Sequence, residues 1–99
     1  MTITFTRFSL SKGADLDQLR ASFFAAGPLF EDAPGLVRKH FIIAEDGRTA
    51  GGVYLWEDRD AAASFLTTFV VPLIFEKFGV EPTIEFFESP HVVEGALPA

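Results

Sequence analysis

Four stretches of the chain alternate in side-chain character as strands do, and two others repeat apolar residues at helical spacing. Residues 2–10, TITFTRFSL, are rich in β-branched and aromatic residues and predict a first strand. Similar patterns predict strands at 36–44, 49–57 and 82–89. Between them, apolar residues three or four positions apart predict one helix over 15–26 and a second over 58–79. The predicted order is β-α-β-β-α-β.

Both predicted helices carry the usual signals at their ends. Asp15 and Asp58 stand where a carboxylate can accept hydrogen bonds from the first free N–H groups of a helix. The Gly-Pro pair at 27–28 ends the first helix. Pro72 lacks an N–H group, so the second helix should kink or restart there before it stops at Gly79.

This order of elements predicts an α+β fold of the ferredoxin-like type. Its four-stranded antiparallel sheet has the strand order 4-1-3-2, and both helices cover one face. We expect one domain over residues 1–89 and a C-terminal arm over residues 90–99, because proline at 90 follows the last strand and no further pattern appears.

Both faces of the predicted sheet are apolar. On the third strand Val53 and Leu55 point away from Tyr54 and Trp56, so neither face is polar. A sheet with one uncovered apolar face exposes more such surface than monomers usually do. We therefore expect a homodimer formed through the sheet faces, with the arm reaching across. The second strand places Leu36 and Ile42 on one face and Val37, Phe41 and Ile43 on the other.

Composition narrows the range of partners. The 99 residues are 48% apolar and include 12 Phe, more rings than so small a core readily encloses. The net charge of −6 disfavours nucleic acid and anionic membranes as partners, and the absence of cysteine excludes disulfides and thiolate sites. The N-terminus shows no signal pattern and the longest apolar run, FVVPLIF, is short, so we expect a cytoplasmic protein.

The stretches PGLVRKHFI, GGVYLW and FFESPHVV, in this order and spacing, resemble the YdhR-like mono-oxygenases of the dimeric α+β barrel superfamily. The resemblance implies that two sheets close into a barrel across the dimer. It also implies that a small, often aromatic, molecule or haem binds between sheet and helices in each subunit. Quinone-forming and haem-degrading members use a pocket Asn, and this chain contains none, so no functional Asn can be carried over and the chain departs from the family's pattern for both reactions.

The segment GGVYLW supplies the predicted binding residues. Missing side chains at Gly51 and Gly52 leave room either for a bulge or for a flat ligand above the sheet. Tyr54 and Trp56 on one face would wall a pocket, together with Phe41 on the neighbouring strand. The alternative is that Tyr54 and Trp56 are ordinary core residues whose polar tips are hydrogen-bonded.

The register of the hairpin decides which basic residue joins this face. An even loop, favoured by Asp46-Gly47 as a type I′ turn, places Lys39 beside Tyr54; an odd loop or a bulge places His40 there. We name Lys39, His40 and Tyr54 as candidate catalytic residues, since a buried base beside a phenol suits deprotonation of a hydroxyaromatic. The alternative is a solvated cation or a salt bridge to Glu57 or Glu85.

Two functions remain open. The first is binding of a flat apolar or hydroxyaromatic molecule, with mono-oxygenation that needs no cofactor or metal as the candidate reaction. His40 and His91 are the only histidines and lie far apart in sequence, so we expect no metal site. The second is a non-catalytic sensing or structural dimer of the same fold. A void of a few hundred Å³ beside Tyr54 would favour the first, and close packing there the second.

Overall fold

Four strands form one antiparallel sheet in the order β2-β3-β1-β4, as predicted. We describe residues 1–97 of the protein from a computed structural model. Its elements are β1 (Thr2–Ser9), α1 (Leu16–Ala26), the 3-10 turn η1 (Gly27–Phe30), β2 (Leu36–Ile43), β3 (Thr49–Trp56), α2 (Arg59–Phe65), the π-helical turn η2 (Leu66–Val70), α3 (Val71–Phe78) and β4 (Thr83–Glu88).

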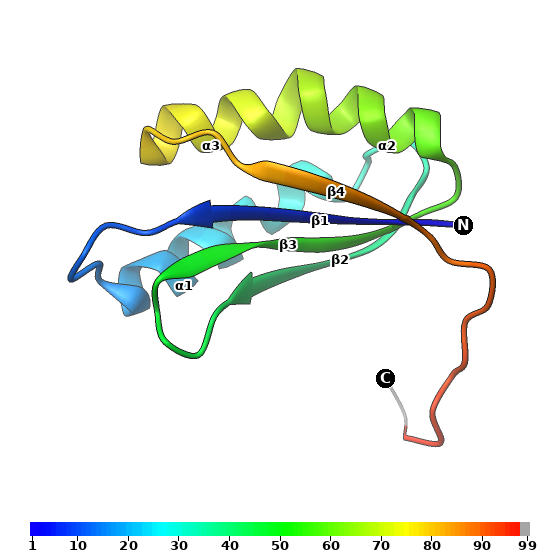
Figure 1. Ribbon diagram of the computed structural model, residues 1–99, viewed down its shortest axis with the longest axis horizontal. Helices are drawn as coiled ribbons and strands as arrows, with labels where there is room; N and C mark the ends of the chain where they lie inside the picture. Colours follow the sequence, from blue (N-terminus) through cyan, green and yellow to red (C-terminus); the bar gives the residue numbers. More distant parts are fainter. Residues whose placement is uncertain (98–99) are drawn as a thin grey trace.

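The helices cover one face of the sheet and leave the other bare. Figure 1 shows α1 behind the sheet, the long α2–η2–α3 helix running along it near β4, and no helix in front among the described residues. Register places Thr4 and Thr6 of β1 on the same face as Tyr54 of β3, and all three are buried. The core between this face and the helices comprises Phe8, Leu19, Ala26, Phe30, Ala50, Tyr54, Trp56, Ala62, Leu66, Val70 and Ile74.

Both helices begin at the predicted caps. The Asp15 carboxylate accepts hydrogen bonds from the N–H groups of Asp17 and Gln18, each at 3.1 Å. Asp58 caps α2 in the same way, at 2.7 and 3.1 Å. Gly79 ends α3 in the left-handed conformation with φ of 72°, which a side chain would disfavour.

The second helix widens just before Pro72, so the predicted irregularity takes the form of a π turn. The Val71 N–H donates to the carbonyl of Leu66, five residues back, and the Thr68 hydroxyl donates to the Ser64 carbonyl at 2.7 Å. By length and composition alone, Arg59–Phe78 could cross a membrane. In this fold the helix instead buries one side chain per turn against the sheet: Ala62, Leu66, Val70 and Ile74.

The β2–β3 hairpin has the predicted even parity but not the predicted turn. The Ala44 N–H donates to the Thr49 carbonyl at 2.9 Å, which leaves residues 45–48 in the loop. Only glycines have positive φ among the described residues, so Asp46 is not left-handed and the expected type I′ turn is wrong. Instead Gly47 has φ of 71°, its N–H donates to the Ala44 carbonyl, and the Asp46 carboxylate accepts from the Arg48 N–H.

A β-bulge at the start of β2 corrects a second expectation. Leu36 pairs with Trp56 and Arg38 pairs with Leu55, so Val37 is the extra residue and is 48% exposed. The bulge turns Leu36 to the helix face, which it shares with Phe41. The prediction that they lie on opposite faces is therefore wrong, because strict alternation along the strand takes no account of an inserted residue.

The bare face of the sheet is apolar at its centre. It carries Phe5, Val53 and Leu55, which are half-buried, and Phe87, which is 46% exposed. After β4 the chain leaves the sheet without regular structure, and Figure 1 shows this segment extending away from the strands. Val93 in it is 78% exposed. Residues 98 and 99 of the predicted arm lie outside the described residues.

Gly51 should tolerate no side chain. A Cβ there would lie 1.8 Å from the Thr6 carbonyl oxygen, a backbone atom that cannot turn away. We expect Gly51→Ala to lower the free energy of unfolding by more than about 2 kcal/mol. Gly27→Ala is the matched control, since Gly27 is helical and its added Cβ meets nothing within 4 Å. It should change stability by less than about 1 kcal/mol. Urea unfolding at one protein concentration measures both, and equal losses would contradict the assigned register.

Candidate active site

The amino group of Lys39 lies among three aromatic rings. Lys39 on β2 pairs with Tyr54 on β3, so their side chains share the helix face. Its Nζ lies 3.3 Å from the ring centre of Phe30, 3.8 Å from that of Phe41 and 4.8 Å from that of Tyr54. Phe30 comes from η1, directly after α1. We call these four residues the lysine cage.

Gly52 makes the lysine cage possible. A Cβ at Gly52 would lie 3.0 Å from Cε of Lys39 and 3.0 Å from Cε1 of Tyr54. The glycine therefore lets the lysine side chain cross β3 in van der Waals contact with the backbone. Of the two alternatives for Gly51 and Gly52, the bulge is wrong, because β3 pairs with β1 without interruption. The expected free space above Gly52 is also wrong, since Lys39 and Tyr54 fill it.

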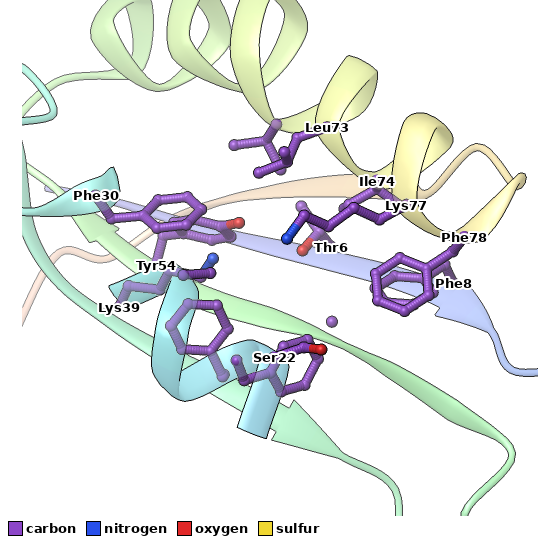
Figure 2. Close-up of a pocket in the computed structure, with 15 residues that line it drawn as sticks. Thr6, Phe8, Ser22, Phe30, Lys39, Tyr54, Leu73, Ile74, Lys77 and Phe78 are labelled. Carbon is purple, nitrogen blue, oxygen red and sulfur yellow. The ribbon is translucent and has the colours of Figure 1, made fainter. Parts of the chain in front are cut away.

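A small cavity adjoins the lysine cage, between the sheet, α1 and α3 (Figure 2). Its volume is about 40 Å³, enough for a few water molecules and well below the few hundred Å³ of a typical ligand pocket. Its lining contains no Asp or Glu among the described residues. The lining residues are Thr6, Phe8, Ser22, Phe23, Ala26, Phe30, Lys39, Phe41, Gly51, Tyr54, Val70, Leu73, Ile74, Lys77 and Phe78.

Two surface grooves share residues with this cavity. A groove of about 650 Å³ along α1 and β2 shares Phe23, Lys39 and Phe41 with it. Phe23 and Phe41 stack with ring centres 5.0 Å apart and thus stand between groove and cavity. A second groove of about 310 Å³ shares Ser22, Lys77 and Phe78. Shared side chains, with Phe23 and Phe41 among them, therefore separate the cavity from a space of ligand size.

Burial lowers the pKa of Lys39 to about 7 from its ordinary value of 10.5. The ring faces act in the opposite direction, because they attract the ammonium form. The two salt bridges within residues 1–97 join Arg7 to Glu85 and Arg20 to Asp17, and neither involves Lys39. A lysine with a lowered pKa and no acidic partner can act as a base near neutral pH.

Tyr54 keeps its proton at neutral pH. Burial raises its pKa to about 12, and the nearby Thr6 side chain opposes this shift only in part. Tyr54 also stacks on Trp56, with ring centres 5.6 Å apart and planes 16° apart. The Trp56 indole N–H donates to the Thr4 hydroxyl at 2.9 Å, so Trp56 is a satisfied core residue. Tyr54 can thus donate a hydrogen bond but is a poor base.

The structure brings together some of the residues named from the sequence and separates others. Lys39, Phe41 and Tyr54 line the cavity. Trp56 lies behind Tyr54 and Gly52 lies beneath Lys39, so neither is on the lining. His40 pairs with Val53 and points to the other face of the sheet. His40 is thereby separated from the cavity by the strand itself.

Phe30 and Lys77 are two of the lining residues that sequence reasoning missed. Phe30 follows the Gly-Pro pair that ends the first helix. The only sequence signal for it was that an apolar residue lies close to a helix end. Lys77 lies in the last turn of α3, three residues after the buried Ile74. That spacing puts both on one helix face, but a lysine there also suits the helix dipole, so the pattern alone did not single it out.

The chain matches a known family over most of its length. The family model described as "Putative mono-oxygenase ydhR" matches residues 7–88. No curated protein matches the chain. Three similar solved structures are 16–19% identical to it and show the same fold.

NE2512 of Nitrosomonas europaea, of unknown function, has 19% identity and a TM-score of 0.71, covering 99% of this chain and 94% of its own. A Streptomyces coelicolor monooxygenase from the gene ActVA-Orf6, bound to nanaomycin D, has 16% identity and a TM-score of 0.67. The match covers 99% of this chain and 92% of that chain. A mutant of SnoaB, a cofactor-independent oxygenase from Streptomyces nogalater, has 19% identity and a TM-score of 0.65. The match covers 95% of this chain and 98% of that chain.

The buried amine should make stability depend on pH. From pH 7 to pH 10 the unfolded chain keeps a proton on Lys39 that the folded chain releases, so the free energy of unfolding rises with pH, by at most about 1.4 kcal/mol per unit. Below pH 7 both states hold the proton. Above pH 10 the unfolded Tyr54 ionises first, since its folded pKa is about 12, and stability falls again.

Lys39→Met should abolish most of the increase in the free energy of unfolding between pH 7 and pH 10, because methionine cannot titrate. Lys12→Met is the matched control, since Lys12 is exposed and lies outside the cavity lining. Urea unfolding of the three proteins at pH 7, 8, 9 and 10 measures the slope. A wild-type slope that persists in Lys39→Met would show that the amine is not desolvated.

Proposed function

Because the chain belongs to the family described as "Putative mono-oxygenase ydhR", we propose that it binds a flat hydroxyaromatic molecule between sheet and helices and oxidises it with dioxygen, without a cofactor. The observation that carries the proposal is the lysine cage: an amine with a lowered pKa, among ring faces, at a cavity without carboxylates. Perturbed bases of this kind concentrate at functional sites.

Three residues of the cage have a role in this proposal. Neutral Lys39 accepts a proton from the hydroxyl or the acidic methylene of the substrate, and the resulting ammonium holds the anion. Tyr54 donates a hydrogen bond to a substrate oxygen. Phe41 supplies an apolar wall. The resulting electron-rich anion then reacts with dioxygen directly.

The proposed reaction balances for an anthrone, whose central CH₂ group becomes C=O. One oxygen atom of O₂ becomes the carbonyl oxygen, and the other leaves as water with the two methylene hydrogens. The carbon is oxidised and dioxygen is reduced, so no external reductant is needed. The proton taken by Lys39 returns to the departing water, which restores the neutral amine for the next cycle.

Binding requires the cavity to open. At about 40 Å³ it cannot hold three fused rings, and the stacked pair of Phe23 and Phe41 separates it from the larger groove. Rotation of Phe23 joins the two spaces. Phe23 is half-buried at the surface of α1, so this motion exposes little of the core.

The proposed assembly is a cytoplasmic homodimer in which two bare sheet faces pack together. Phe5, Val53, Leu55 and Phe87 form the apolar patch that would be covered. The Arg7–Glu85 ion pair lies at the edge of the same face. The segment after residue 90, with Val93 exposed, is available to reach over the second copy.

A second candidate is a non-catalytic sensing or structural dimer. The small volume of the cavity and the complete burial of Trp56 favour it, because a close-packed interface there needs no ligand to be stable. In that case the lysine cage contributes only to the core.

Dioxygen uptake by metal-free protein with a panel of anthrones, quinols and catechols tests the enzymatic proposal. We expect Lys39→Met to lower the rate by about 100-fold or more, since a general base contributes about 10²–10⁴. Tyr54→Phe, which keeps the ring and removes the hydroxyl, should lower it less. Lys12→Met should leave it unchanged. Equal rates for wild type and Lys39→Met would remove Lys39 from the mechanism, and no uptake with any substrate would favour the non-catalytic dimer.

A matched pair of substitutions tests the dimer. Phe87→Glu places a charge on the bare sheet face, and Phe24→Glu places the same charge on the outer side of α1, where Phe24 is 88% exposed. Sedimentation at micromolar concentration should show a dimer for the wild type and Phe24→Glu, and a monomer for Phe87→Glu. A folded wild-type monomer would contradict the proposed assembly.

A further inference from the structure

The charge of the cavity is opposite to that of the protein. The chain has 14 acidic and 8 basic residues, which gives a net charge of −6. Yet the cavity is lined by two of the three lysines, Lys39 and Lys77, and by no acidic residue of the described chain. Figure 2 shows both amino groups directed toward the space beside the Tyr54 hydroxyl and Thr6. The two lysines come from opposite walls, β2 and α3.

We propose that the ligand is an aromatic acid, a planar ring system carrying an ionised carboxylate, and that its carboxylate lies between Lys39 and Lys77. This inference rests on the proposed function, since it assigns the chemical class of the molecule bound at the same site. It adds Lys77 as a binding residue and excludes purely neutral arenes as the preferred ligand.

Pairing of charges is the first physical reason. Within residues 1–97 no salt bridge partner faces Lys39, so its ammonium form is buried without an opposite charge. A neutral aromatic ligand would remove the remaining water and leave that charge still unpaired. A carboxylate supplies the missing charge and accepts strong hydrogen bonds from both amines.

The neutral polar groups of the cavity fit the same ligand. The hydroxyls of Ser22 and Tyr54 are on the lining and can donate to carboxylate oxygens, whereas the Thr6 hydroxyl donates to the Gly52 carbonyl at 3.4 Å. The remaining lining is mainly aromatic and aliphatic, which suits a ring system attached to the acid. The cavity thus combines an apolar wall with several donors and no competing carboxylate.

Lys77 is placed to meet the acid at the surface. It is exposed, it lines the groove of about 310 Å³ as well as the cavity, and Ser22 of α1 lies on both. A carboxylate that first pairs with Lys77 at this opening needs only to move inward to reach Lys39. Attraction by Lys77 also counters the repulsion that the negative net charge exerts on an anion.

The surroundings of Lys39 define how binding should respond to pH. Tyr54 and Lys77 face it within the cavity, and Arg20, His40 and Glu45 line the adjoining open groove. Glu45 is the one acid among them, and it lies where water screens its charge. A carboxylate that enters beside Lys39 therefore favours protonation of this amine, so binding at pH 8 should take up protons from the buffer. Lys39 must then lose this proton again before it acts as the base of the proposed reaction.

Matched ligands test the inference. Isothermal titration at pH 8 compares 2-naphthoate with 2-naphthamide, which has the same shape and no charge. We expect wild type to bind the naphthoate at least about tenfold more tightly. Titration in phosphate and in Tris, whose ionisation enthalpies differ, should show net proton uptake for the naphthoate only.

Variants assign the preference to the two lysines. Lys39→Met and Lys77→Met should each reduce the ratio of the two affinities by about tenfold, and Lys12→Met should retain it. Lys39→Arg keeps the charge and should retain part of the preference, which separates loss of charge from misfolding of the methionine variant. Circular dichroism checks that each variant is folded.

The outcomes separate this inference from the proposed function. If the two ligands bind wild type equally, the aromatic site stands and the carboxylate class is wrong. If the preference survives in both methionine variants, the lysines do not bind the acid. If neither ligand binds, the aromatic site itself fails and the inference falls with it.

Discussion

The burial of one amine without an acidic partner constrains the rest of this site. Desolvation of Lys39 is unfavourable, and three ring faces compensate for it only in part. The arrangement exists because Gly52 leaves room for the lysine side chain over β3 and because η1 brings Phe30 above it. If residue 39 only filled space in the core, a leucine or methionine would pack there as well, without the cost of desolvating an amine. A buried amine without an acidic partner is therefore an argument for ligand chemistry.

Much of the fold follows from local patterns in the sequence. Alternation and helical spacing gave the order of elements, and Asp15 and Asp58 marked the helix starts correctly. The errors concern single residues: the bulge at Val37 and the conformation of Asp46. Each depends on how a strand pairs with its neighbour, which the residue itself does not encode. The even number of residues in the hairpin loop was predictable from the sequence. Any even loop pairs Lys39 with Tyr54, so the error in the turn type did not affect this pairing.

The site was less predictable than the fold, for a reason of packing. Register placed Lys39, Phe41 and Tyr54 on one face, and this could be read from the hairpin. Whether the space above Gly52 is empty or filled depends on the rotamer of Lys39, which the sequence does not fix. Phe30 and Lys77 reach the cavity from elements outside the hairpin. Their positions follow from how α1 and α3 dock on the sheet, so local signals at these residues do not show that they reach the cavity.

One strand links the cavity to the bare face of the sheet. In β3, Tyr54 faces the cavity, while Val53 and Leu55, its neighbours in sequence, face the apolar patch. Packing of a second sheet on that patch would fix the strands on which Lys39 and Tyr54 stand. Any opening needed to admit a ligand must then occur on the helix side. There the π turn precedes Pro72 and Phe23 lies at the surface of α1. Such a division, a rigid sheet that holds the amine and a helix layer that admits the ligand, would keep Lys39, Phe41 and Tyr54 in place during binding.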